Sequence, residues 1–328
     1  MLKQSKAFFL LLFFFCTNAS FSQTNYSFFE IPDTLNKRRF NNSLIAGLGV
    51  YGSGSTWPWT QWYSQYELGE FHFHNDMGDW AHMDKAGHVF SAYTESNIAY
   101  SYIRWTGLED SKAILTSALV GTGVQLTFEI MDGFSNDWGF SVPDVAFNTL
   151  GVGVFYFQQK YWKEQRFIFK SSNSFAAYPD YSVLGSDGSY ADLGSRGAEL
   201  YGTGLGARYL KDYNTMNIWL SVNPAAFISN ENSRVPGWLN IAIGYGAENL
   251  YGGVENNWPT KDPVYFLDTS LFPRYSQYYL SLDVDFTRIK TNSGFLKAAF
   301  KVLNIFKVPA PTLEYNAVNG FRFIPLYW

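Results

Sequence analysis

The side chains that could do acid–base or metal chemistry are concentrated in one short stretch of this chain. All four histidines lie between positions 72 and 88, namely His72, His74, His82 and His88, and Asp76, Asp84 and Lys85 lie among them. If the segment from Asp84 onward is helical, Asp84 and His88 are one turn apart on the same face. This segment is therefore the natural starting point for a functional site.

Two later segments carry polar side chains at helical spacing within otherwise apolar sequence. Glu129 and Asp132 are three residues apart, and Asp144 and Asn148 are four apart. Charged groups in an apolar surrounding are costly unless they are paired. We therefore predict a helical bundle around a polar centre, formed by Asp84, Lys85, His88, Glu129, Asp132, Asp144 and Asn148.

Three interpretations of this centre follow, in decreasing order of preference. The first is a structural network in which Lys85 and His88 neutralise the carboxylates. The second is a catalytic site, in which a carboxylate orients His88 as a general base and the other candidates are Asp84, Lys85 and Glu129. The third is a metal site using His88 with His72, His74, Asp76 and His82. It is the weakest because the chain has no HExxH spacing. No cofactor is predicted, and the sequence leaves open whether the protein is an enzyme.

Hydrophobic patterning predicts the elements that position these residues. Helices are expected over 84–104, 113–128 and 144–159, with Pro143 suited to the first turn of the last one. We assign these helices to a module spanning 41–166, which follows an irregular lead-in at 23–40.

The amino terminus and the composition indicate export. Residues 1–22 combine a basic start, a short apolar run and small residues, the pattern of a signal peptide. Without Lys3 and Lys6 the formal net charge moves from −4 to −6, so no nucleic-acid partner is expected. Aromatic residues reach 20% and charged residues only 16%, against about 25% charged in soluble domains. This bias favours contact with a membrane.

The carboxyl-terminal part, 167–328, has the pattern of a β-rich region. Alternating sequence predicts strands over 239–246 and 278–287 and a weaker one over 217–222. An amphipathic helix is expected near 293–306, where its basic face favours either a membrane surface or packing against the sheet. The predicted class is α+β with an antiparallel sheet. A complete barrel is the second choice, because eight strands of lipid-spanning length are not recognisable.

The polar motifs carry a family resemblance. The pattern Asp84-Lys85-x-x-His88, then Glu129, then Asp144-x-x-x-Asn148-x-x-Gly151 resembles the YfiM-like family of predicted periplasmic lipoproteins and, more distantly, the VanZ-like membrane proteins. The resemblance spans roughly residues 40–160. It implies a compact helical module of unestablished activity in the cell envelope. A lipobox is not recognisable at Cys16, and the long β-rich half departs from the family pattern.

We therefore expect an exported protein at the outer membrane or its periplasmic face. The leading hypothesis is a non-enzymatic component that binds outer-membrane lipid or an envelope protein. The alternative is a hydrolase or transferase acting on lipid or a cell-wall precursor through His88 with Asp84 or Glu129.

Overall fold

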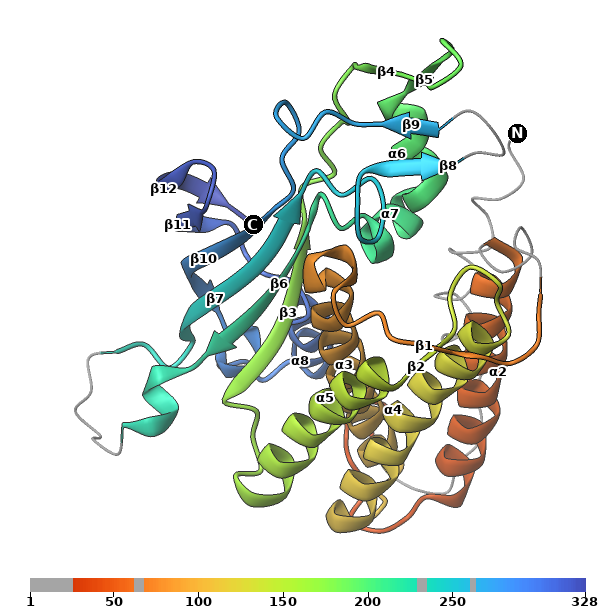
Figure 1. The fold of residues 1–328 in the computed structure, drawn as a ribbon. Helices are drawn as coiled ribbons and strands as arrows, with labels where there is room; N and C mark the ends of the chain where they lie inside the picture. Colours follow the sequence, from red (N-terminus) through yellow and green to blue (C-terminus); the bar gives the residue numbers. More distant parts are fainter. Residues whose placement is uncertain (1–25, 62–67, 229–234, 260–263) are drawn as a thin grey trace.

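The computed structural model describes residues 26–61, 68–228, 235–259 and 264–328. Helices dominate its amino-terminal half and an antiparallel sheet its carboxyl-terminal half (Figure 1), which confirms the α+β class. The expected signal peptide, 1–22, lies outside the described residues.

In the described part of the amino-terminal half there are four long helices: α2 (Lys37–Gln61), α3 (Met83–Trp105), α4 (Asp110–Gly133) and α5 (Val142–Tyr161). The three helices predicted after the histidine-rich segment are present, each longer than the pattern indicated. Ser141 starts α5, since its side chain accepts a hydrogen bond from the Asp144 amide at 3.1 Å, and Pro143 occupies the first turn. A short parallel pair, β1 (Phe73–His74) and β2 (Phe140–Ser141), joins the histidine-rich segment to the start of α5.

Helix α3 lies between α4 and α5 on one side and the sheet on the other (Figure 1). Glycine allows the close approach of these helices. A Cβ atom on Gly151 of α5 would lie 2.4 Å from the Val89 carbonyl oxygen of α3, and one on Gly121 of α4 would lie 2.2 Å from Ser96 Oγ. Polar groups on the facing sides of α3, α4 and α5 are therefore held close together.

The main sheet has six antiparallel strands in the order β12-β11-β10-β7-β6-β3. They are β3 (Phe167–Asn173), β6 (Met216–Val222), β7 (Leu239–Glu248), β10 (Tyr275–Val284), β11 (Ala310–Asn316) and β12 (Gly320–Tyr327). The strand predicted over 278–287 ends at Val284, because Asp285 caps a 3-10 turn through the Thr287 amide. The sheet is open, and its described strands form no closed barrel. The edge of β3 away from β6 pairs with the segment 305–307 through Ser171.

The sheet has an inverted distribution of polarity over β7, β10 and β11. The buried positions of β10 and β11 are mostly polar, whereas those of β7 are Asn240 and a set of alanines and glycines. The buried Lys170 of β3 pairs with Asp283 of β10 at 2.8 Å. The alternate positions are apolar and exposed. One such row runs in register across the strands and consists of Ile243, Leu280, Leu313 and Phe323. A sheet of a water-soluble domain normally buries its apolar face instead.

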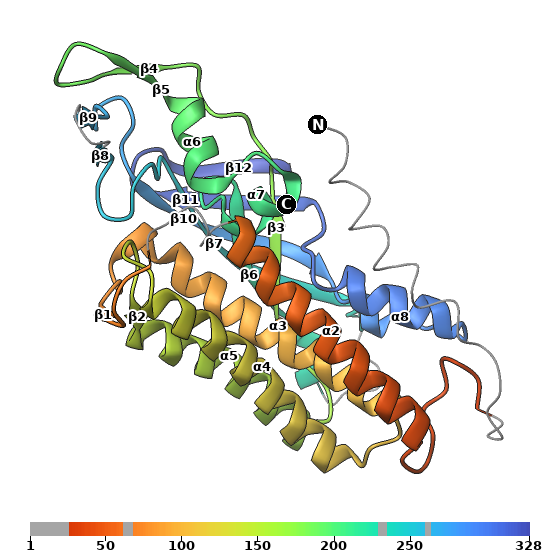
Figure 2. The ribbon, with the colours of Figure 1, turned by 90° about the vertical axis from the view of Figure 1, so that its right-hand side faces the viewer.

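The remaining elements surround this framework. The strands β4 (Ser182–Leu184), β5 (Tyr190–Asp192), β8 (Asn257–Pro259) and β9 (Val264–Phe266), with helices α6 (Leu193–Tyr201) and α7 (Leu205–Lys211), form the upper part in Figure 1. Helix α8 (Gly294–Leu303) is capped by Ser293 and ends three residues before the predicted limit. It lies at the side of the molecule, apart from α4 and α5 (Figure 2).

A buried apolar cluster joins the two halves. Met83 at the start of α3 packs against Met216 and Ile218 of β6 and against Ala247 and Leu250 at the end of β7. The amino-terminal end of α3 is therefore fixed by the β-rich half.

Candidate functional site

The centre of the site is the ammonium group of Lys85, whose side chain is only 2% exposed. Its Nζ lies 2.7 Å from Asp76 Oδ1, 2.8 Å from Asp84 Oδ2 and 2.6 Å from Asp144 Oδ1. Three ion pairs of this length satisfy the three donors of a lysine ammonium. Since three carboxylates face one cation, the cluster needs further positive charge or bound protons to become neutral.

Two local devices hold the carboxylates in place. Ser141 donates to Asp76 Oδ1 at 2.6 Å and accepts from the Asp144 backbone amide at 3.1 Å, so one hydroxyl links the Asp76 carboxylate to the start of α5. Before α3, the consecutive residues Trp80, Ala81 and His82 adopt left-handed backbone angles, with φ of 51°, 49° and 62°. Such angles are uncommon without glycine.

Contacts from the β-rich half hold this left-handed turn. The Trp80 amide donates to the Gly253 carbonyl at 2.8 Å, and the Tyr245 hydroxyl donates to the Ala81 carbonyl. The turn sets the direction in which Asp84 and Lys85 leave the start of α3.

His88 lies beside the lysine on α3 and contacts a second layer of polar groups. Its Nδ1 donates to Asn148 Oδ1 at 3.0 Å, and Asn148 Nδ2 donates to Glu129 Oε1 at 3.3 Å. The other ring nitrogen, Nε2, lies 3.7 Å from Asp84 Oδ1 and 3.5 Å from Asp144 Oδ1. The side chains of His88 and Asp84 keep 19% and 20% exposure, so this side of the cluster is less buried than Lys85.

Burial and the charges of neighbouring residues shift the pKa values of Glu129, Asp144 and His88. Burial raises the pKa of Glu129 to about 8 and, with the nearby Asp84 charge, raises that of Asp144 to about 7. Burial alone lowers the pKa of His88, but Asp84, Asp144 and Glu129 outweigh it and raise the value to about 9. Near pH 7, His88 is therefore a cation and Glu129 is mostly a neutral acid. Glu129 Oε2 is buried without a hydrogen-bond partner, which fits a neutral carboxyl better than a carboxylate.

The arrangement also offers a set of metal ligands. Asp84, His88 and Asp144 each present one ligand atom, and these atoms lie within 4.8 Å of one another. A tetrahedral zinc ion with bonds of about 2.0–2.1 Å separates its ligand atoms by roughly 3.3 Å, close to the distances from His88 Nε2. The hydrogen bond from Nδ1 to Asn148 is the kind that orients a ligating histidine. Against a metal, Asp84 and Asp144 already bind the Lys85 ammonium.

The structure brings most of the predicted polar centre together. Asp84, Lys85, His88, Glu129, Asp144 and Asn148 are in mutual contact, whereas Asp132 acts on this cluster through its charge, which raises the pKa of Glu129. Of the weaker metal candidates, Asp76 joins the cluster at Lys85.

The other three histidines lie outside the cluster. Both ring nitrogens of His72 are near backbone carbonyls, His74 Nε2 lies 3.6 Å from Asp79, and His82 Nδ1 contacts the Met77 carbonyl at 2.7 Å. Their role in metal binding stays a prediction.

Two members of the site were missed from the sequence. The Tyr213 hydroxyl donates to Asp84 Oδ1 at 2.8 Å across a separation of 129 residues, and no local pattern indicates this contact. Ser141 does have a signal, since a serine three residues before Asp144 and two before Pro143 is typical of a helix cap.

Comparison with known protein families finds a match over the segment that contains most of the cluster. Residues 70–160 match the family described as predicted periplasmic lipoprotein (DUF2279). This range contains α3, α4, most of α5 and every cluster residue named above except Tyr213. The comparisons give no support to the VanZ-like resemblance. No curated protein and no solved structure matches the chain. Through this segment the chain is similar to an exported, periplasmic family of unknown function.

Proposed function

We propose that this protein is a non-enzymatic component of the outer membrane that binds lipid through the apolar face of its six-stranded sheet. The observation that carries the proposal is the inverted polarity of β7, β10 and β11. Ile243, Leu280 and Leu313 are 57%, 51% and 40% exposed in adjacent strands, while Ser281 and Thr312 are buried and bond each other at 2.8 Å. Apolar residues outside and polar residues inside are typical of β-structure in contact with outer-membrane lipid.

Lipid is a better occupant for this face than a protein partner. The row continues into aromatic neighbours, since Tyr278 pairs with Tyr315 and Tyr315 with Phe321, and all three are exposed. A contiguous apolar face of this extent is rare on soluble monomers. Helix α4 adds a further apolar surface, because it is long and apolar enough to span a membrane and only 33% of its most apolar window is buried.

The test is membrane retention of a variant with a polar sheet face. We expect the wild-type chain to stay in the outer-membrane fraction after a carbonate wash, and the triple variant Ile243→Asn, Leu280→Asn, Leu313→Asn to be released. The matched control carries Leu184→Asn, Leu205→Asn and Val254→Asn, which replace exposed apolar residues outside the main sheet. It should stay bound.

Release of the wild-type chain into soluble periplasm overturns the proposal, and so does full retention of the sheet variant. Circular dichroism of each variant shows whether it has folded. If the triple variant does not fold, the single change Leu280→Asn is compared with Leu205→Asn instead.

A second candidate function is a hydrolase or transferase acting on lipid or a cell-wall precursor. It is favoured by the partly exposed side chain of His88, whose ring is oriented by Asn148. Because the pKa of His88 is raised to about 9, the side chain fits a general acid at neutral pH better than a general base. Folded His88→Ala, Asp84→Ala and Glu129→Ala variants that fully complement a deletion strain would contradict this role. Product formation by the pure protein that is lost in His88→Ala would support it.

A further inference from the structure

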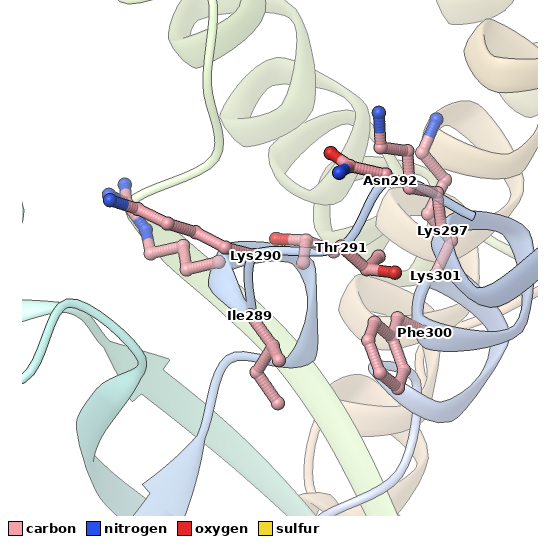
Figure 3. Close-up of a pocket in the computed structure, with 9 residues that line it drawn as sticks. Ile289, Lys290, Thr291, Asn292, Lys297, Phe300 and Lys301 are labelled. Atoms are coloured by element: carbon pink, nitrogen blue, oxygen red, sulfur yellow. The ribbon is translucent and has the colours of Figure 1, made fainter. Parts of the chain in front are cut away.

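A cavity of about 470 Å³ lies beside α8, far along the chain from the Lys85 cluster. Its lining comes from the loop 287–292 and from one side of α8, with Lys290, Thr291, Asn292, Lys297 and Lys301 among the contributing residues (Figure 3). Lys297 and Lys301 are one helical turn apart, and their ammonium groups extend in the same direction next to Asn292 (Figure 3).

The charge around this cavity is of one sign. Four of its lining residues are basic and none is acidic. The whole stretch from Phe286 to Leu313 contains no aspartate or glutamate, in a chain that has more acidic than basic residues overall. Arg288 is engaged by Glu164 at 2.7 Å and Asp285 at 3.2 Å. Lys290, Lys297 and Lys301 have no carboxylate partner among the described residues, so three cations remain to bind an anion.

An apolar surface lies next to these cations. On α8, Phe295 is 65% and Val302 58% exposed, and Leu303 is exposed as well. Phe29, itself exposed, packs edge-on against Phe295 with ring centroids 6.5 Å apart and extends the surface beyond the helix. An amphipathic helix with lysines beside large apolar side chains is suited to the boundary between headgroups and acyl chains.

We propose that this cavity binds the phosphate of an anionic phospholipid headgroup while the apolar side of α8 lies in the acyl boundary. The inference rests on the proposed membrane association and adds a headgroup preference and a site for it. Lys297 and Lys301 neutralise the phosphate, and Thr291 and Asn292 offer neutral hydrogen-bonding groups for the rest of the headgroup. Charge selects the anionic lipid, and the adjacent Phe295 and Val302 favour a lipid over a free phosphate ion.

The experiment is vesicle flotation of the full mature chain diluted from non-ionic detergent. One set of vesicles contains phosphatidylcholine alone and the other contains phosphatidylglycerol mixed with phosphatidylcholine. The wild-type chain should bind the anionic vesicles at least tenfold more tightly, since lysines near an anionic surface are attracted to it. The variant Lys297→Gln, Lys301→Gln should lose most of this preference and keep its binding to neutral vesicles. The control Lys37→Gln, Lys160→Gln makes the same change of charge at exposed lysines elsewhere and should behave as wild type.

Equal binding of both vesicle types by the wild-type chain overturns the inference, as does an unchanged preference in the cavity variant. A third arm uses inorganic phosphate in titration calorimetry. Tight phosphate binding that depends on Lys297 and Lys301, without any preference for anionic vesicles, identifies a free-anion site and also overturns the lipid assignment.

The same assay separates this inference from the proposed function. If the sheet variant Ile243→Asn, Leu280→Asn, Leu313→Asn loses its binding to neutral vesicles, this supports lipid binding by the sheet face and does not bear on the cavity. Retention of the anionic preference in that variant supports the cavity independently of the sheet.

Discussion

At the scale of single residues, the main feature is a lysine that is shielded from water by three carboxylates. The Lys85 ammonium has all its partners within 2.8 Å, and His88 adds a second positive charge that is anchored through Asn148. Removing one partner from such a buried group leaves uncompensated charge, which costs more than the ion pair itself contributes.

Lys85→Met should therefore destabilise the protein strongly. We expect a loss of about 3–5 kcal/mol in the free energy of unfolding, because Asp76, Asp84 and Asp144 are left without their common cation. Urea denaturation followed by circular dichroism measures it. Lys112→Met is the control, since this exposed lysine forms a surface ion pair with Glu109, and its loss should cost less than about 1 kcal/mol. An unchanged midpoint for Lys85→Met would mean that the cluster is hydrated.

Stability should fall as the pH rises from about 5 to 9. Glu129 keeps its proton to about pH 8 in the folded chain but only to about its ordinary value of 4.5 when unfolded. His88 similarly keeps its proton to about pH 9 instead of 6.5. In both cases the folded state binds more protons, so stability present at low pH is lost as the pH rises through these windows.

Glu129→Gln tests this pH dependence. It keeps a neutral group at every pH, so its melting temperature should fall less between pH 5 and pH 9 than that of the wild type. Glu109→Gln, at an exposed carboxylate, should keep the wild-type slope. If the melting temperature of Glu129→Gln falls as much between pH 5 and pH 9 as that of the wild type, the raised pKa of Glu129 is contradicted.

At the scale of elements, the site depends on how closely α5 and α4 approach α3. Val89 O, Ala92 Cβ and the Tyr93 amide all lie within 3.1 Å of the place where a Cβ of Gly151 would be. Two of these three atoms belong to the backbone of α3, so they cannot move aside as the end of a side chain can. The contacts from His88 to Asn148 and from Lys85 to Asp144 both cross the interface of α3 and α5.

Gly151→Ala should therefore separate α3 from α5 and destabilise the chain by about 1–3 kcal/mol. Gly153→Ala is a matched control on the same helix, because nothing lies within 4 Å of the place where its added methyl group would be, and alanine favours helix. That change should be neutral or should stabilise by up to about 1 kcal/mol. Urea midpoints of the two variants give the comparison, and equal effects would show that the helices are not in close contact at Gly151.

At the scale of the whole molecule, the helical half and the β-rich half share both a core and the site. Met83 packs against residues of β6 and β7, and Tyr213 and Tyr245 bond to the start of α3 from the other half. We therefore expect the described halves to unfold as one cooperative unit.

Met83→Ala tests this coupling. Met83 is fully buried, so its truncation should cost about 2–5 kcal/mol. Hydrogen exchange should accelerate in both α4 and β10, although neither of these two elements contains the substituted residue. Met77→Ala, at an exposed methionine, should leave both unchanged. Faster exchange in α4 with unchanged protection of β10 would mean that the halves unfold separately.

Features that depend on neighbours within a few residues could be predicted from the sequence. Asp84 and His88 lie one turn apart in any helix, so their shared face followed from spacing alone, as did α3, α5 and the stripe of α8. The spacing also indicated that Glu129, Asp144 and Asn148 needed partners, since such groups are costly in apolar surroundings. It could not indicate Tyr213, whose bond to Asp84 depends on where the approach to β6 places a residue far along the chain.

Which face of the sheet lies inside depends on contacts between strands that are distant in the sequence. Alternation in 239–246 and 278–284 requires two different faces, yet a period of two is satisfied equally well with either face buried. The polar face is internal because Lys170, Asp283, Ser281 and Thr312 find partners there, and those partners come from separate strands. The apolar face with Ile243, Leu280 and Leu313 is therefore exposed. The sequence of one strand cannot show which of its two faces is buried, because the contacts that decide this come from other strands.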